Sequence, residues 1–221
     1  MQISVIFDMD GVIVNNGEFH YRAWKKFCDK YQISFSEDTF KNKFFGRTNE
    51  EVLPELFGYE LSGREIKSFG EDKEKIYREI YKPHMQPVDG LLNLLRELKK
   101  ENIPVGVATS APPENVEFVI QGLEIGDFFQ TIIDDSMVLN GKPAPDIYLE
   151  AAKRLNSSPG NCIVFEDSLS GTKAAWQAGA KVVALTTTLP ASKHKYAHRT
   201  MNDFKMASID FIHSLFTDAV E

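Results

Sequence analysis

Two carboxylates and a glycine follow an apolar run near the start of the chain. Asp8 comes directly after Ile3-Ser-Val-Ile-Phe7, Asp10 stands two residues later, and Gly11 follows it. The apolar run predicts a buried strand, and glycine permits a sharp turn after it. Two like charges held close together favour a cation between them, and oxygen ligands favour Mg²⁺. A carboxylate beside such a cation can attack a phosphoryl group. The alternative is a plain turn, since Asp and Gly are common turn residues.

From residue 88 onward, helical and strand-like segments alternate. Apolar residues at helical spacing predict helices, and short β-branched runs predict strands. We expect helices at 88–101, 113–122, 145–155 and 169–178, and strands at 104–108, 131–133, 162–165 and 181–185. This alternation predicts an α/β fold with a doubly wound parallel sheet. Such sheets bind ligands at the carboxyl ends of their strands, so reactive side chains should follow the strands.

Polar side chains do follow the expected strands. Thr109 and Ser110 come after the strand at 104–108, and offer a hydroxyl and free backbone amides to phosphate oxygens. Lys142 lies in a proline-stiffened loop, and Glu166 and Asp167 follow the strand at 162–165. Each has an ordinary alternative: a helix cap for Thr109 or the two acids, and a solvated charge for Lys142. Their gathering at one sheet edge favours a site.

Residues 15–86 have a different pattern, in which no strand is expected. Helical spacing predicts helices at 18–31, 36–45, 49–57 and 63–82. We therefore expect a core domain from 1–14 and 87–221, and a small inserted helical cap domain at 15–86.

The composition is that of a soluble globular protein. Apolar residues make up 43%, and the net charge of −7 argues against a nucleic-acid surface. We see no membrane span or secretory signal, and no helix stripe left over for a partner. The sequence predicts a cytoplasmic monomer that acts on a small molecule, with no membrane or nucleic-acid partner.

Several residues are interpreted as structural. Cys28 and Cys162 are predicted to be reduced core thiols, and Trp24 and Trp176 to be core aromatics. The basic run at 192–199 is predicted to be an exposed loop.

With these motifs in hand, the chain resembles the haloacid dehalogenase-like superfamily of phosphotransferases, from residue 3 to about residue 204. It is most similar to the β-phosphoglucomutase and small-molecule phosphatase branch, which has a Rossmann-like core and a helical cap. The motifs that carry the resemblance are Phe7-Asp-Met-Asp-Gly-Val12, Thr109, Lys142 in Gly-Lys-Pro-Ala-Pro-Asp146, and Glu166-Asp167 followed by Gly171.

The resemblance implies a role for each motif residue. Asp8 would be the nucleophile and Asp10 the general acid and base, while Thr109 and Lys142 would hold the transferring phosphoryl group. Mg²⁺ would be held by Asp8, the backbone carbonyl of Asp10 and Asp167, with Glu166 as a direct or water-mediated ligand. Asp10 also separates the chain from the dehalogenating relatives, which lack an acid there.

The expected cap resembles the mutases only in part. His20 matches the family's segment leading into the cap, where a histidine lies near the catalytic acid; the alternative is a histidine packed in the core. Gly46 and Arg47 occupy the substrate-specificity loop. The mutases carry a lysine just before this glycine and an arginine three residues after it, whereas this chain has Phe45 and Asn49.

Three further residues are candidates for substrate binding. Lys73 falls where the mutases hold a second phosphate-binding lysine, but its charged surroundings favour a solvated lysine. Ser110 and Asn115, on the loop after the second core strand, complete the set.

These observations predict a Mg²⁺-dependent phosphatase of a small phosphorylated metabolite, a sugar or polyol phosphate, that works through an aspartyl-phosphate. The alternatives are a phosphomutase of the β-phosphoglucomutase type, an inorganic pyrophosphatase, and a catalytically silent binding protein.

Overall fold

The structure is a computed structural model that describes residues 2–40, 44 and 47–217. The chain divides into two compact units. One, here the α/β unit, comprises Met1–Asn15 and Gln86–Glu221, and the other, the helical unit, comprises Asn16–Met85. Within the described ranges, no helix is both long and apolar enough to cross a membrane.

A six-stranded parallel sheet forms the centre of the α/β unit. Its order is β3-β2-β1-β4-β5-β6, with the central strand β1 rich in buried β-branched residues. In the register of the sheet, Phe7 pairs with Val107 on one side and with Phe165 on the other. The carboxyl ends of β1, β2 and β4 therefore lie level with one another, which brings the polar residues that follow them together. The strands are β1 (Ser4–Phe7), β2 (Val105–Ala108), β3 (Thr131–Ile133), β4 (Cys162–Glu166), β5 (Lys181–Leu185) and β6 (Arg199–Met201).

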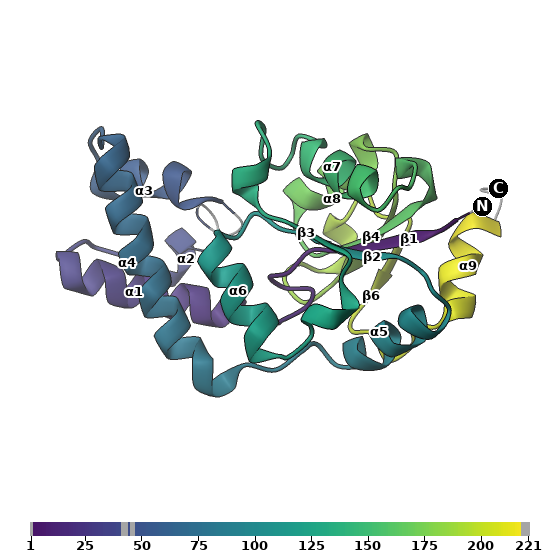
Figure 1. Ribbon diagram of the computed structural model, residues 1–221. Helices are drawn as coiled ribbons and strands as arrows, with labels where there is room; N and C mark the ends of the chain where they lie inside the picture. Colours follow the sequence, from purple (N-terminus) through teal and green to yellow (C-terminus); the bar gives the residue numbers. More distant parts are fainter. Residues whose placement is uncertain (1, 41–43, 45–46, 218–221) are drawn as a thin grey trace. The chain divides into compact units, whose positions relative to one another are not determined.

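Helices cover both faces of this sheet, which confirms the predicted fold class. Figure 1 shows α7 and α8 on one face and α5 with α9 on the other. The α7 and α8 face buries small and aliphatic side chains against the strands, while Phe7, Phe165 and Phe204 form an aromatic cluster. The helices of this unit are α5 (Leu91–Lys100), α6 (Pro113–Gly122), α7 (Asp146–Arg154), α8 (Leu169–Gln177) and α9 (Ile209–Thr217), with 3-10 turns at Gly126–Phe128, Asp135–Met137, Pro159–Asn161 and Ala191–Lys193.

Two predictions about the α/β unit are wrong. The basic run at 192–199 is not simply an exposed loop, because His194 is buried and Arg199 begins β6. Trp176 is 53% exposed rather than part of the core. Its helix, α8, places Ala174 and Ala175 in the core instead, and the indole packs against Tyr196 near the surface.

The helical unit consists of α1 (Gly17–Tyr31), α2 (Glu37–Thr39), α3 (Asn49–Phe57), α4 (Gly63–Tyr81) and a 3-10 turn at Lys82–His84. None of its described residues lies in a strand. Ser62 begins α4 as part of a capping box with Glu65. Trp24 and Phe27 pack in the core of this unit, as predicted for Trp24. Cys28, here, and Cys162, in the α/β unit, are free and buried, as predicted.

Candidate active site

The carboxyl ends of β1, β2 and β4 bring the predicted motif residues to one edge of the sheet. The Asp8 amide donates to Phe165 O (2.9 Å), which continues the strand pairing and places Asp8 beside the end of β4. Glu166 is the last residue of β4, and Asp167 follows it. The chain turns after Asp8 at Gly11, whose φ of 78° suits glycine.

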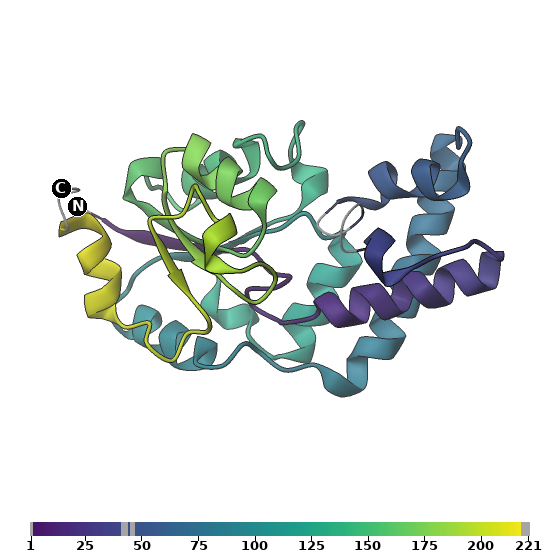
Figure 2. The ribbon, with the colours of Figure 1, turned by 180° about the vertical axis from the view of Figure 1, so that it is seen from behind.

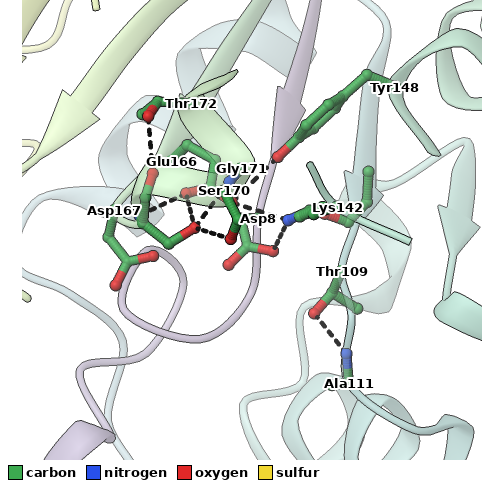
Figure 3. Close-up of polar contacts among 12 residues, drawn as sticks. Asp8, Thr109, Ala111, Lys142, Tyr148, Glu166, Asp167, Ser170, Gly171 and Thr172 are labelled. Atoms are coloured by element: carbon green, nitrogen blue, oxygen red, sulfur yellow. Dashed lines mark hydrogen bonds and ion pairs between the residues drawn. The ribbon is translucent and has the colours of Figure 1, made fainter. Parts of the chain in front are cut away.

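Lys142 reaches this edge from the loop before α7. Its Nζ lies 2.6 Å from Asp8 Oδ1, 2.8 Å from Glu166 Oε1 and 3.3 Å from Ala108 O (Figure 3). All three ammonium hydrogens are thus engaged. Burial alone would lower the pKa of Lys142, but Asp8 and Glu166 raise it well above its usual value. Lys142 is therefore a buried cation between two carboxylates, not a solvated loop charge.

Glu166 accepts hydrogen bonds at both of its oxygens. Oε1 accepts from Lys142 and from the Tyr148 hydroxyl (3.2 Å), while Oε2 accepts from the Ser168 amide (2.6 Å) and hydroxyl (3.0 Å). A Cβ at Gly171 would overlap this carboxylate, so glycine is required there. Because a carboxylate has about four acceptor positions, Glu166 is already fully bonded. It is better suited to hold Lys142 than to bind a cation directly.

Asp8, Glu166 and Asp167 form a three-carboxylate group that could hold a metal ion, with Glu166 contributing its charge beside the other two. One oxygen from each lies within 4.8 Å of the others, and all three residues are buried. Burial is the largest cause that raises the pKa of Asp8, to about 7, followed among the raising causes by Glu166. Burial first, then Glu166 and Asp8, also raises the pKa of Asp167 well above its usual value. One ammonium against three carboxylates leaves an excess of negative charge that a hard divalent cation would neutralise, so these residues fit Mg²⁺.

Two carboxylate oxygens are available to such an ion. Among the described residues, no hydrogen-bond partner is recorded for Asp8 Oδ2 or Asp167 Oδ1. Asp10 lies in the turn closed by the bonds from Ile13 N (2.8 Å) and Val14 N (3.1 Å) to Met9 O, and its side chain is not in the three-carboxylate group. Its charge is among those that raise the pKa of Asp8, so it lies near the site.

The three candidates that follow β2 have different settings. Thr109 is buried; its amide donates to Ile133 O (3.0 Å), and its Oγ1 accepts from the Ala111 amide (3.1 Å, Figure 3). The prediction of a free amide is thus wrong for Thr109, because the sheet uses that amide, but the hydroxyl hydrogen is left to donate. Ser110 is half-buried beside it. Asn115 is not on a loop: it is a buried residue in the first turn of α6.

His20 and Lys73 lie together in the helical unit. Lys73 Nζ is 3.0 Å from His20 Nδ1 and 2.8 Å from Glu74 Oε1, and its side chain is only 3% exposed. The favoured interpretation of a solvated lysine is therefore wrong. Asn49 Nδ2 donates to the same Glu74 oxygen (3.0 Å). Burial, and then Lys73, lowers the pKa of His20 to about 3, and its ring stacks on Tyr77.

The remaining two candidates are Arg47, which lies shortly before α3, and Gly46. Arg47 is exposed and pairs with Glu55 (2.8 Å), while its guanidinium also donates to Glu51 O. Gly46 lies outside the described residues.

Sequence reasoning missed four residues of the site, namely Tyr148, Ser168, Thr187 and Thr188. Thr188 donates to Asp167 Oδ2, and Thr187 donates to Gly11 O (2.6 Å). These threonines come directly after β5, so the rule that singled out Thr109 could have found them. Ser168 follows β4 in the same way and could also have been found by this rule, whereas Tyr148 had no comparable signal, since a tyrosine in a helix is ordinary.

Comparisons with known proteins agree with this geometry. The family model described as haloacid dehalogenase-like hydrolase matches residues 5–185. The chain is 34% identical over 185 residues to the β-phosphoglucomutase of Bacillus subtilis, covering 80% of each. It is 32% identical over 184 residues to a phosphorylated carbohydrates phosphatase of Thermotoga maritima, covering 80% of this chain and 81% of that protein. A crystal structure of a HAD hydrolase, family IA, variant 3, from Entamoeba histolytica superimposes with a TM-score of 0.91 at 33% identity, covering 99% of this chain and 100% of the other. The chain belongs to the haloacid dehalogenase-like hydrolase family.

Proposed function

We propose that the protein is a Mg²⁺-dependent phosphatase of small phosphorylated metabolites, sugar or polyol phosphates, that works through an aspartyl-phosphate on Asp8. The observation that carries this proposal is the pairing of Asp8 with Lys142 beside Asp167. One oxygen of Asp8 is fixed by an ammonium, and the other is available at the edge of the sheet. Similarity to proteins named for phosphorylated carbohydrates supports the substrate class.

The residues of this chain divide the reaction between them. Asp8 attacks phosphorus, the bond from phosphorus to the leaving oxygen breaks, and Asp10 gives that oxygen its proton. Asp10 then takes a proton from water, which attacks the aspartyl-phosphate and releases inorganic phosphate and free Asp8. Lys142 balances the charge of the phosphoryl group, and the Thr109 hydroxyl donates to one of its oxygens.

Asp8 and Asp167, with the backbone carbonyl of Asp10, would hold the Mg²⁺. When bound, the ion supplies further charge neutralisation at the phosphoryl oxygens. Glu166 stays behind these ligands and holds Lys142 in place. We assign the choice of substrate to the helical unit, as a cap domain of residues 15–86 inserted in a core of 1–14 and 87–221.

A phosphomutase is the second candidate, favoured by the 34% identity to a β-phosphoglucomutase. Two observations favour the phosphatase over it. Asn49 stands where the mutases carry an arginine, and Lys73 is already neutralised by Glu74 within the helical unit.

Phosphate release from a panel of sugar and polyol phosphates and pyrophosphate, with and without Mg²⁺, tests the proposal. Asp8→Asn should abolish release, and Asp210→Asn, a matched change on the exposed side of α9, should not. Release that requires Mg²⁺ and Asp8 supports the phosphatase, and the preferred substrate separates it from a pyrophosphatase. Conversion of a hexose 1-phosphate that needs added bisphosphate, with no phosphate released, would establish the mutase instead. Silence in both assays would overturn the enzymatic proposal.

A further inference from the structure

Three consecutive threonines follow β5, and their hydroxyls have different destinations. Thr187 donates to Gly11 O (2.6 Å), and Thr188 donates to Asp167 Oδ2. Thr186 instead donates to Asn202 Oδ1 (2.6 Å). Figure 2 shows the loop after β5, in yellow-green, beside the purple loop that follows β1. Two of the three threonines thus contact the candidate active site, and the third does not.

The two contacted groups also touch each other. A Cβ built on Gly11 would overlap Asp167 Oδ2, so this oxygen packs directly on the backbone of the turn after Asp10. Thr188 binds the Asp167 carboxylate in this contact, and Thr187 binds the Gly11 carbonyl. Adjacent side chains on one segment therefore fix the separation between the turn and Asp167.

The segment that carries these threonines is itself anchored at both ends. At one end, the Thr186 amide donates to Met201 O (2.9 Å), which extends the pairing with β6. At the other, the buried His194 ring donates from Nε2 to Leu189 O (3.3 Å). A segment tied at both ends can hold its side chains in place, which a free loop could not.

We propose that Thr187 and Thr188 form a positioning clamp for the cation site. By occupying Oδ2 of Asp167, Thr188 leaves Oδ1 to bind the ion, and Thr187 holds the turn whose Asp10 carbonyl completes the ligand set. This inference rests on the proposed function, because it assumes that Asp167 binds Mg²⁺. Groups that orient metal ligands in this way typically change metal affinity by about 10- to 100-fold when removed.

The test is the Mg²⁺ dissociation constant measured by calorimetry on the full chain. We expect Thr188→Val to weaken Mg²⁺ binding by about 10-fold or more, because valine keeps the shape but cannot donate. Thr188→Ser should bind Mg²⁺ like the wild type, because serine keeps a hydroxyl that can donate. Thr187→Val should weaken binding as well, by a smaller factor, since it acts through the turn. Thr186→Val is the matched control and should bind Mg²⁺ like the wild type. Melting temperatures in EDTA measure any loss of stability separately from the loss of affinity.

Each outcome has a distinct meaning. Weaker Mg²⁺ binding by Thr187→Val and Thr188→Val supports the clamp, provided that Thr186→Val and Thr188→Ser bind Mg²⁺ like the wild type. Unchanged Mg²⁺ affinity in Thr188→Val, in a wild type that binds Mg²⁺, would overturn the clamp and leave the proposed function standing. A lower melting temperature of Thr188→Val without a change in its Mg²⁺ affinity would also overturn the clamp. A wild type that binds no Mg²⁺ would overturn the proposed cation site, and the clamp with it.

Discussion

Lys142 Nζ lies 2.6 Å from Asp8 Oδ1, although the two residues are 134 positions apart in the chain. Both side chains are buried, and the same ammonium lies 2.8 Å from Glu166. Lys142 offsets the repulsion between the two buried carboxylates, and they in turn favour its charged form. Removing the ammonium would therefore leave two buried carboxylates without a compensating charge.

Lys142→Met should consequently damage both stability and activity. The change leaves Asp8 and Glu166 buried without their cation, and breaking a buried pair typically costs about 3–5 kcal/mol. Urea unfolding in EDTA at pH 8 would measure the loss. Lys153→Met, which removes an exposed lysine of α7, should stay within about 0.5 kcal/mol of the wild type. A loss below about 1 kcal/mol for Lys142→Met would show that the ammonium does not carry the charge balance.

Asp8→Asn should stabilise the metal-free protein, and the gain should depend on pH. The pKa of Asp8 is about 7 in the folded chain, chiefly through burial, against 3.8 as its ordinary value. Between these values the folded chain keeps a proton that the unfolded chain releases, so stability falls as pH rises from about 4 to about 7. Three pKa units correspond to about 4 kcal/mol at most.

Asparagine does not titrate, so the variant avoids this loss. In EDTA at pH 8 we expect the variant to be more stable than the wild type by about 2–4 kcal/mol. At pH 5 this difference in stability should be smaller by about 2 kcal/mol. Urea unfolding at the two pH values measures the difference, with Asp210→Asn as the control. A stability gap that does not change with pH would contradict a raised pKa at Asp8.

Gly171→Ala should disturb the site through Glu166. The added Cβ would overlap the Glu166 carboxylate, which four hydrogen bonds hold in place. We expect a stability loss of about 1–3 kcal/mol, as for overpacking, together with lower phosphate release. Gly63→Ala is the control, because no atom lies within 4 Å of its Cβ and alanine favours helices. Equal behaviour of the two variants would show that Glu166 can move without consequence.

The residues at the sheet edge could be predicted because one rule covers them all. In a parallel sheet the carboxyl ends of the strands lie at one edge, so Asp8, Thr109 and Glu166 had to meet if the strands were recognised. Five of the six strands were recognised from their β-branched runs. β6 was missed because its three residues, Arg199–Met201, carry no apolar run.

Features that depend on packing could not be predicted in this way. Lys73 lies in Glu-Asp-Lys-Glu-Lys, which has the pattern of a solvated face, and only the packing of α1 on α4 places its ammonium over the Trp24 ring. Trp176 was misassigned for the opposite reason: a large aromatic residue is usually buried, but α8 has small residues on its inner face. The tyrosine that bonds Glu166, Tyr148, likewise depends on where α7 packs.

Lys73 and Glu74 offer a last test, since they form a buried pair in the helical unit. Their charged atoms are 2.8 Å apart, and the side chains are 3% and 8% exposed. Lys73→Met leaves the buried Glu74 charge without the ammonium, and Glu74→Gln leaves the Lys73 charge without the carboxylate, so each change should cost about 3–5 kcal/mol. The double variant has no buried charge left at this pair. Its loss in the free energy of unfolding should be smaller than the sum of the two single losses by about 1–3 kcal/mol, the usual coupling of groups in contact.

The pKa of the neighbouring His20 provides an independent measurement of the interaction between Lys73 and Glu74. Burial first, and Lys73 second, lowers the pKa of His20 to about 3, so the imidazole is neutral and accepts from the ammonium. In Lys73→Met the repulsion from the ammonium is gone while the burial remains, and the pKa of His20 should rise. An NMR titration of the His20 ring follows this change, while urea unfolding of the four proteins gives the coupling. Additive losses together with an unmoved His20 pKa would mean that Lys73 and Glu74 contribute separately, and that the short distance between them carries no energetic consequence.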